Sequence, residues 1–208
     1  MKNLKHFIWD YDGTLMNTYP RTVSCLRKAL EDFGKTAEPV EVLEKMMETI
    51  PFAVNYYSEF YNLPELNDHF RKYLAEMPKD DINVFENIPE VLKRIKDIGA
   101  NNYIFTHSGK EIYPFLDKFG ITEYFTEIVT NESEYFKLKP APDVIIYLME
   151  KYGGTLENTA MVGDRRCDLE SGYNAGCKAI HLLTPEVPQY PPCDWRISNF
   201  NEMLEMLK

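Results

Sequence analysis

The sequence predicts an α/β fold: a parallel sheet flanked by helices, with a small all-helical segment inserted after the first strand. Two observations lead to this prediction. Short apolar, β-prone segments alternate with helical stretches of about ten residues over most of the chain, which is typical of parallel sheets joined by crossover helices. The interval between Gly34 and Gly99, by contrast, contains none of the chain's ten glycines and has the pattern of several short helices.

Length and charge limit the organisation and the classes of partner. At 208 residues the chain is longer than a typical small domain and shorter than two, so one domain with a large insertion is expected. The 33 acidic and 23 basic residues give a net charge of −10, which argues against nucleic acid or an anionic membrane surface as a partner. No apolar run approaches the ~20 residues of a membrane span, and no signal-peptide pattern is visible, so we expect a cytoplasmic protein.

Five short apolar segments are expected to be strands buried on both faces, because they are rich in β-prone residues and lack polar alternation. They cover residues 6–9, 103–105, 127–129, 160–162 and 179–183. Apolar residues three or four positions apart predict helices between these strands. The predicted helices cover residues 89–98, 109–119, 142–152 and 168–175.

The inserted segment begins with a predicted helix over residues 20–33, which Gly34 ends. Prolines divide the rest into short helices, because proline is tolerated in a first turn and stops a preceding helix. These prolines are Pro39, Pro51, Pro64 and Pro78. A stiff loop near the C-terminus is predicted from a second group, which consists of Pro185, Pro188, Pro191 and Pro192. We therefore expect a core of residues 1–15 and 84–208 and a helical insertion of residues 16–83. The four cysteines lack C-x-x-C spacing and are expected to be reduced thiols.

Two carboxylates directly follow the first predicted strand. Asp10 and Asp12 belong to the sequence Asp-Tyr-Asp-Gly-Thr, and Asp and Gly are poor strand formers. The two carboxylates are therefore expected on a turn at the carboxyl end of the sheet, where α/β proteins bind ligands. A turn that merely ends the strand is the alternative.

Polar residues follow the later strands as well. Thr106 ends the second strand and precedes a predicted helix start, whose backbone N–H groups suit a phosphate oxygen. Lys139 lies directly before Pro140 and ahead of a helix, and Asp164 and Asp168 lie four positions apart at the next strand-to-helix turn. Each has an ordinary explanation on its own, such as a helix cap or a solvated lysine. Their common placement predicts that they meet at one edge of the sheet.

These motifs and their order resemble the haloacid dehalogenase superfamily, in its branch with a helical cap that includes phosphoglycolate phosphatases and β-phosphoglucomutases. The resemblance covers essentially the whole chain. It rests on Asp10, Asp12, Gly13 and Thr14 for the first motif, Thr106 for the second, Lys139 for the third, and Asp164 with Asp168 for the fourth. It implies a Rossmann-like, three-layer core, with the helical cap where the glycine-free interval lies.

The resemblance also implies a chemistry: Mg²⁺-dependent hydrolysis of a small phosphorylated metabolite through an aspartyl-phosphate intermediate. Asp10 is the implied nucleophile and Asp12 the implied general acid and base. The implied metal site consists of Asp10, the main-chain carbonyl of Asp12 and Asp164, with Asp168 behind them. The intact second Asp of the first motif favours phosphoryl transfer over cleavage of carbon–halogen or carbon–phosphorus bonds.

Three further residues are implied as contacts of the phosphorylated substrate: Thr106, His107 and Lys139. Lys137 could be the lysine of the third motif in place of Lys139, but Lys139 is preferred because it directly precedes Pro140. His107 lies where the family often has asparagine. The alternative is that His107 is a surface residue without a role in substrate binding.

Two other functions stay open at this point. One is a sugar-phosphate mutase of the same architecture, and the other is a non-catalytic, phosphate-binding regulatory protein. The expected partner is a small phosphorylated metabolite rather than a nucleic acid or a membrane, and the expected assembly is a monomer or a weak homodimer. The sequence does not name the substrate.

Overall fold

The structure is a computed structural model that describes residues 1, 3–77, 79–133, 135–183 and 192–208. The described residues form two compact units. One contains residues 1–16 together with 84–183 and 192–208, and the other contains residues 17–83. The chain passes between the units at two short strands that pair with each other, β2 (Met16–Asn17) and β3 (Asn83–Val84).

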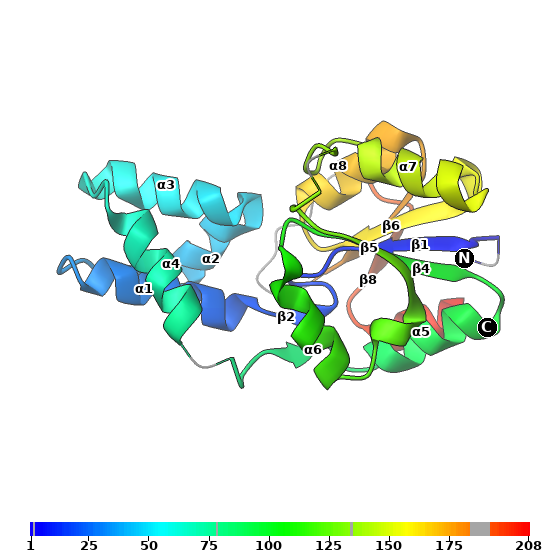
Figure 1. Ribbon diagram of the computed structural model, residues 1–208, viewed down its shortest axis with the longest axis horizontal. Helices are drawn as coiled ribbons and strands as arrows, with labels where there is room; N and C mark the ends of the chain where they lie inside the picture. The colour runs from blue at the N-terminus through cyan, green and yellow to red at the C-terminus, as the bar shows by residue number, and fades with distance from the viewer. Residues whose placement is uncertain (2, 78, 134, 184–191) are drawn as a thin grey trace. The chain divides into compact units, whose positions relative to one another are not determined.

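The larger unit is built on a six-stranded parallel sheet with the order β5-β4-β1-β6-β7-β8 (Figure 1). Its strands are β1 (His6–Trp9), β4 (Asn101–Phe105), β5 (Phe125–Val129), β6 (Thr159–Gly163), β7 (Lys178–Leu182) and β8 (Trp195–Ile197). The chain runs outward from β1 through β4 to β5, and then returns to β6 on the other side of β1. In α/β sheets, ligands bind at the carboxyl ends of the strands beside such a reversal.

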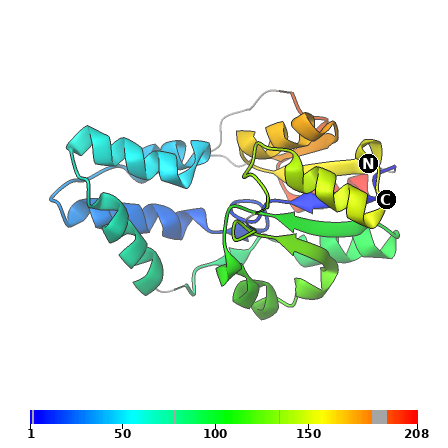
Figure 2. The same cartoon turned by 45° about the horizontal axis from the view of Figure 1, so that its top comes forward.

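Helices cover both faces of this sheet (Figures 1 and 2). On one face lie α7 (Asp143–Tyr152) and α8 (Arg166–Ala175), which pack together, and on the other lie α5 (Ile88–Asp97) and α9 (Phe200–Met206). The shorter elements are α6 (Tyr113–Lys118) and the 3₁₀ turns η1 (Lys110–Ile112), η2 (Thr122–Tyr124) and η3 (Leu156–Asn158). The Rossmann-like, three-layer α/β architecture is thus confirmed.

All five predicted strands are present, within two residues of the expected bounds. The helix predicted over 109–119 is wrong in its first half, where only the 3₁₀ turn η1 forms. Pro114 lies in the first turn of α6 and has no N–H to donate, so the α-helix begins there. The strand β8 and helix α9 were not predicted, although Asn199 accepts a hydrogen bond from the Glu202 N–H as an N-cap.

The smaller unit is helical. Its helices are α1 (Tyr19–Glu31), α2 (Pro39–Glu48), α3 (Ile50–Tyr61) and α4 (Leu66–Glu76). Both α1 and α3 pack against α2 and α4, and apolar side chains from all four helices form one core. Pro39 and Pro51 lie in the first turns of α2 and α3, as predicted. Pro78, Pro185, Pro188 and Pro191 lie outside the described residues.

Two further features concern the thiols and the lengths of the helices. All four cysteines, Cys25, Cys167, Cys177 and Cys193, are free thiols, as predicted. In the part of the chain that the structure describes, no helix has the length and apolar character needed to cross a bilayer.

A buried polar pair connects the central strand to its neighbours. Trp9 Nε1 donates to Asn102 Oδ1 at 3.0 Å, and Asn102 Nδ2 donates to the Leu92 carbonyl at 3.1 Å. Trp9 and Asn102 are completely buried. Since a buried donor without an acceptor is destabilising, this pair holds β1 against β4 and α5.

Replacing Asn102 with alanine should destabilise the protein by about 1–3 kcal/mol, because the Trp9 N–H would be buried without an acceptor. Urea unfolding followed by far-UV circular dichroism measures this loss. Asn101→Ala is the matched control: the side chain of Asn101 makes an exposed hydrogen bond with Thr126 at 3.4 Å, and its loss should change stability by less than ~0.5 kcal/mol. Equal destabilisation by the two substitutions would contradict the role of the buried pair.

Candidate active site

Three neighbouring strands end beside one another, and the residue that follows each one carries a polar side chain. Asp10 follows β1, Thr106 follows β4 and Asp164 follows β6. The strand β1 pairs in parallel with both of the other strands, and the last residues of β1 lie beside the last residues of its neighbours. The three side chains therefore start from the same edge of the sheet.

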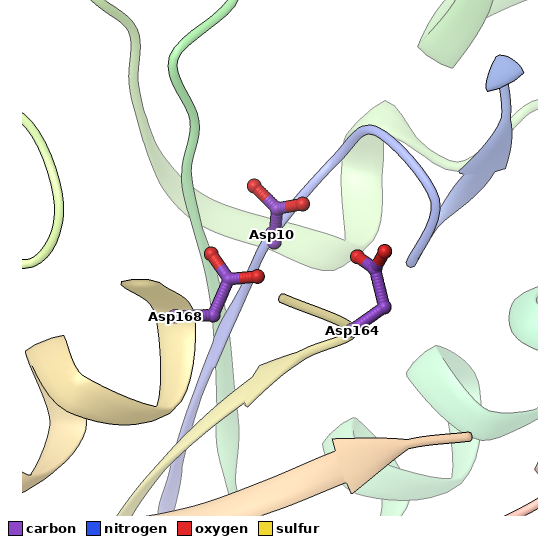
Figure 3. Close-up of side chains that lie close together, drawn as sticks. All are labelled: Asp10, Asp164 and Asp168. Carbon is purple, nitrogen blue, oxygen red and sulfur yellow. The ribbon is translucent and has the colours of Figure 1, made fainter. Parts of the chain in front are cut away.

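Three buried carboxylates gather at this edge, those of Asp10, Asp164 and Asp168 (Figure 3). One oxygen of each lies within 4.8 Å of the others, and all three residues are 0% exposed. Asp168 lies in the first turn of α8, where the helix dipole favours a negative charge. That effect is at most a few kcal/mol, so three buried carboxylates require stronger compensation.

Lys139 supplies much of this compensation. Its ammonium group contacts Asp10 Oδ1 and also Asp168 Oδ1, the latter at 2.6 Å, and all three side chains are completely buried. Lys139 comes from the loop between β5 and α7, and Lys137, two residues earlier in that loop, is exposed. The structure thus brings Lys139, and not Lys137, to the carboxylates.

Gly163 leaves the space that the Asp168 side chain occupies. A Cβ atom built on Gly163 would lie 2.3 Å from the Asp168 Cβ, so a larger residue does not fit there. The main-chain N–H of Arg165 donates to Asp168 Oδ2 at 3.0 Å and fixes the carboxylate in this space. The glycine at the end of β6 is therefore what allows α8 to deliver its carboxylate beside Asp10.

Two buried side chains hold Asp164. Thr14 Oγ1 donates to Asp164 Oδ1 at 2.8 Å, and His181 Nε2, on β7, donates to the Asp164 carbonyl at 3.1 Å. Thr14 and His181 are both 0% exposed. Thr14 belongs to the first motif but had no predicted role, and a single histidine in an apolar strand gave no signal for His181.

Arg165 also lies beside the three buried carboxylates, although no role was predicted for it. Its Nη2 lies 3.5 Å from Asp10 Oδ2, its Nε lies 4.0 Å from Asp168 Oδ2, and its side chain is 3% exposed. The neighbouring Arg166 is exposed and pairs with Glu170 at 2.6 Å. The position of Arg165 directly after Asp164 was the one available signal in the sequence, but nothing there distinguishes it from Arg166.

Burial and charge set the protonation of these groups. Burial and the nearby Asp168 raise the pKa of Asp10 to about 6, against the opposing charges of Lys139 and Arg165. Burial also acts to raise the pKa of Asp168, but Lys139 and Arg165 bring it below its ordinary value. Burial acts to lower the pKa of Lys139, and the two carboxylates raise it above the ordinary value. Lys139 is therefore a permanent cation, and Asp10 is the group that takes up a proton first.

Asp12 and Thr106 meet through Ser108. Asp12 is partly exposed, and its Oδ2 accepts a hydrogen bond from Ser108 Oγ at 2.5 Å. Thr106 Oγ1 accepts from the Ser108 N–H at 3.0 Å. Thr106 therefore closes a local turn, and helical structure begins four residues later, at Lys110, as a 3₁₀ turn. The Asp12 carboxylate lies outside the three-carboxylate group, so the carbonyl of Asp12 is the atom it could offer to a metal.

His107 lies close to the two cations of the group. Its Nε2 is buried without a hydrogen-bond partner. Burial, together with the charges of Lys139 and Arg165, lowers the pKa of His107 to about 3. The ring is therefore neutral, and His107 as a whole is partly exposed.

The three-carboxylate group has the properties of a site for a divalent metal ion. It offers only oxygen ligands, which Mg²⁺ prefers. Three carboxylates with Lys139 and Arg165 leave one net negative charge, so a cation would still be attracted. The residues present thus fit Mg²⁺.

The chain is similar to known proteins over most of its length. The sequence pattern of the family described as haloacid dehalogenase-like hydrolase matches residues 7–182. A phosphoglycolate phosphatase of Mannheimia succiniciproducens is 26% identical, over 96% of each chain. A hydrolase of Streptococcus pneumoniae TIGR4 is 29% identical, with a TM-score of 0.68 over 99% of this chain and 100% of that one. A predicted phosphoglycolate phosphatase of Haemophilus somnus 129pt shares the fold, with a TM-score of 0.82 at 24% identity over 100% of both chains.

Replacing Lys139 with methionine should destabilise the protein by about 3–5 kcal/mol near pH 8, because two buried carboxylates would lose their shared cation. The loss should be smaller near pH 5. The pKa of Asp10 is already raised to about 6 with Lys139 present, and without the cation it rises further, so the folded variant is relieved of a charge when it binds a proton. Urea unfolding at the two pH values measures both losses.

Lys137→Met is the control, because it makes the same substitution at an exposed position two residues away. It should change stability by less than ~0.5 kcal/mol at either pH. If Lys139→Met were equally destabilising at both pH values, the lysine would act through packing and not through its charge.

Proposed function

Since this chain belongs to the haloacid dehalogenase-like hydrolase family, we propose that it is a Mg²⁺-dependent phosphatase that hydrolyses a small phosphorylated metabolite. The observation that carries the proposal is the buried Asp10 carboxylate at the end of β1, with Lys139 on one oxygen and Arg165 3.5 Å from the other. A phosphate monoester repels an unshielded carboxylate by about 4 kcal/mol for each pair of charges at 4 Å. Cations on both sides of Asp10 offset this repulsion. The relatives that are named phosphoglycolate phosphatase support the same class of reaction.

In the first step, Asp10 is the nucleophile. One oxygen of its carboxylate forms a bond to phosphorus while the bond from phosphorus to the ester oxygen breaks, and Asp12 gives a proton to that leaving oxygen. The hydrogen bond from Ser108 orients the Asp12 carboxyl group for this transfer. Thr106 and Lys139 hold the transferring phosphoryl oxygens, and the product alcohol leaves Asp10 phosphorylated.

In the second step, water attacks the aspartyl-phosphate. Asp12, now deprotonated, accepts a proton from the water as its oxygen bonds to phosphorus. The bond from phosphorus to Asp10 then breaks, which restores the carboxylate and releases inorganic phosphate. Asp12 ends the cycle protonated, as it began.

Asp10, Asp164 and the main-chain carbonyl of Asp12 would hold the Mg²⁺, with Asp168 behind them against Lys139. When bound, the ion reduces the negative charge that the nucleophile and the phosphate oxygens present to each other. Thr14 and His181 keep Asp164 in place for this role. The helical segment of residues 16–83 is the part of the chain that we assign to substrate selection.

Asp10→Asn should lower phosphate release by about three orders of magnitude or more, because the amide is not a nucleophile for phosphorus. The assay is phosphate release with Mg²⁺ over a panel of sugar phosphates, phosphoglycolate and nucleotides. Wild-type protein quenched during turnover should carry one phosphoryl group on Asp10 by mass spectrometry. Asp97→Asn, at an exposed acid on α5, is the control and should retain full activity.

The same assay separates the alternatives. A sugar-phosphate mutase would interconvert isomers and release little phosphate, because its aspartyl-phosphate is transferred to a substrate hydroxyl. Absence of turnover on the whole panel would point to a non-catalytic phosphate-binding protein. Near wild-type release by Asp10→Asn would rule out Asp10 as the nucleophile.

Mg²⁺ should bind the substrate-free protein more weakly as the pH falls through about 6. The pKa of Asp10 is raised to about 6, so below this pH the ion has to displace a proton, and its affinity should fall by up to about tenfold per pH unit. Calorimetric titration with MgCl₂ between about pH 5 and 8, in buffers of different ionisation enthalpy, gives both the affinity and the protons released. Asp164→Asn should weaken binding at every pH, and a pH-independent affinity in the wild type would contradict a role of Asp10 as ligand.

A further inference from the structure

Arg165 has no role in the two steps described above, although it lies against the nucleophile. Its guanidinium is 3% exposed, with Nη2 3.5 Å from Asp10 Oδ2. Removing an arginine charge from water is costly unless nearby groups compensate for it. Asp10 and Asp168 provide part of this compensation, and the charges of the site indicate what else the guanidinium could bind.

The net charge of the site, with and without a bound phosphoryl group, indicates a role for this arginine. With Lys139 and Arg165, the three carboxylates leave one net negative charge, and Mg²⁺ changes this to one net positive charge. A phosphoryl dianion then brings the complex to a single negative charge, whereas the same complex without the arginine would carry two. Arg165 already offsets part of the charge of Asp10 and Asp168 in the substrate-free site, and it would halve the excess negative charge of the complex once a phosphoryl dianion is bound.

The positions of the two cations agree with this role. Lys139 contacts Asp10 through Oδ1, and Arg165 faces Asp10 through Oδ2. A phosphoryl group bonded to Asp10 thus has one cation near each carboxylate oxygen. The planar guanidinium has a fork of N–H donors that matches two phosphate oxygens, which a lysine ammonium cannot do.

We propose that Arg165 binds the phosphoryl group of the substrate, as a second protein cation beside Lys139. The inference rests on the proposed function, because it requires a phosphoryl group at Asp10. It has a second consequence: a guanidinium this close to Asp10 repels Mg²⁺. Arg165 should therefore strengthen phosphate binding and weaken metal binding.

Arg165→Gln tests both effects without a measurement of turnover. Inorganic phosphate titrated calorimetrically in saturating Mg²⁺ should bind the variant at least about tenfold more weakly, the equivalent of one charge-assisted hydrogen bond. Mg²⁺ titrated alone should bind it more tightly than the wild type. Weaker binding of both would show that Arg165 only holds Asp168 in place, and an unchanged phosphate affinity would also overturn the inference.

Two further variants make the test specific. Arg166→Gln removes the adjacent arginine, which is exposed and paired with Glu170, and should leave both affinities within about twofold of the wild type. Arg165→Lys keeps the charge and loses the fork, so its phosphate affinity should lie between those of the wild type and Arg165→Gln. If circular dichroism shows that Arg165→Gln does not fold, the lysine variant decides, and a wild-type phosphate affinity there overturns the inference.

The proposed function can fail separately. If wild-type protein with Mg²⁺ does not bind inorganic phosphate, both the phosphatase proposal and the role of Arg165 are wrong. If the wild type binds phosphate and Arg165→Gln binds it equally well, only the role of Arg165 is wrong.

Discussion

The ion pair of Lys139 with Asp10 and Asp168 is the interaction on which the rest of the site depends. An unpaired buried carboxylate is unfavourable by several kcal/mol, so two of them beside each other cannot stay charged in the sheet edge without a cation. The ammonium group that joins them is completely buried. Its presence lets Asp10 remain within reach of ionisation, with a pKa raised only to about 6. The ion pair thus keeps the proposed nucleophile, Asp10, close to its ionised form although its side chain is completely buried.

The architecture supplies the two carboxylates of that ion pair from rigid elements. Asp10 follows the central strand β1, which is anchored by the buried hydrogen bond between Trp9 and Asn102. The reversal of strand order at β1 brings β6 beside it, and Gly163 at the end of β6 leaves room for the carboxylate of α8. Side chains mounted on strand ends and a first helical turn keep their relative positions better than side chains on a long loop.

Much of this site was predictable because its residues interrupt regular patterns. Asp10, Thr106 and Asp164 are polar residues at the ends of apolar strands, and parallel strands bring such ends together. Arg165 could not be separated from Arg166 in the sequence, because the direction of each side chain depends on how α8 leaves β6. The first half of the 109–119 segment is a different case, because Pro114 in the sequence could have indicated that the α-helix begins only there.

A net charge of −10 is compatible with the anionic substrate that we propose. The surface charges are too distant to repel it strongly, whereas the cations of the site are close to it. At physiological ionic strength the screening length is about 8 Å, so salt largely screens the site from the charges of most surface acids. Lys139 and Arg165 lie within 4 Å of the Asp10 carboxylate and are buried away from solvent. Together with the Mg²⁺ that we propose, two cations around one carboxylate would favour a group with two negative charges over one with a single charge. If the site binds phosphate esters as we propose, it should favour monoesters over diesters by charge alone, before any contact with the rest of the substrate.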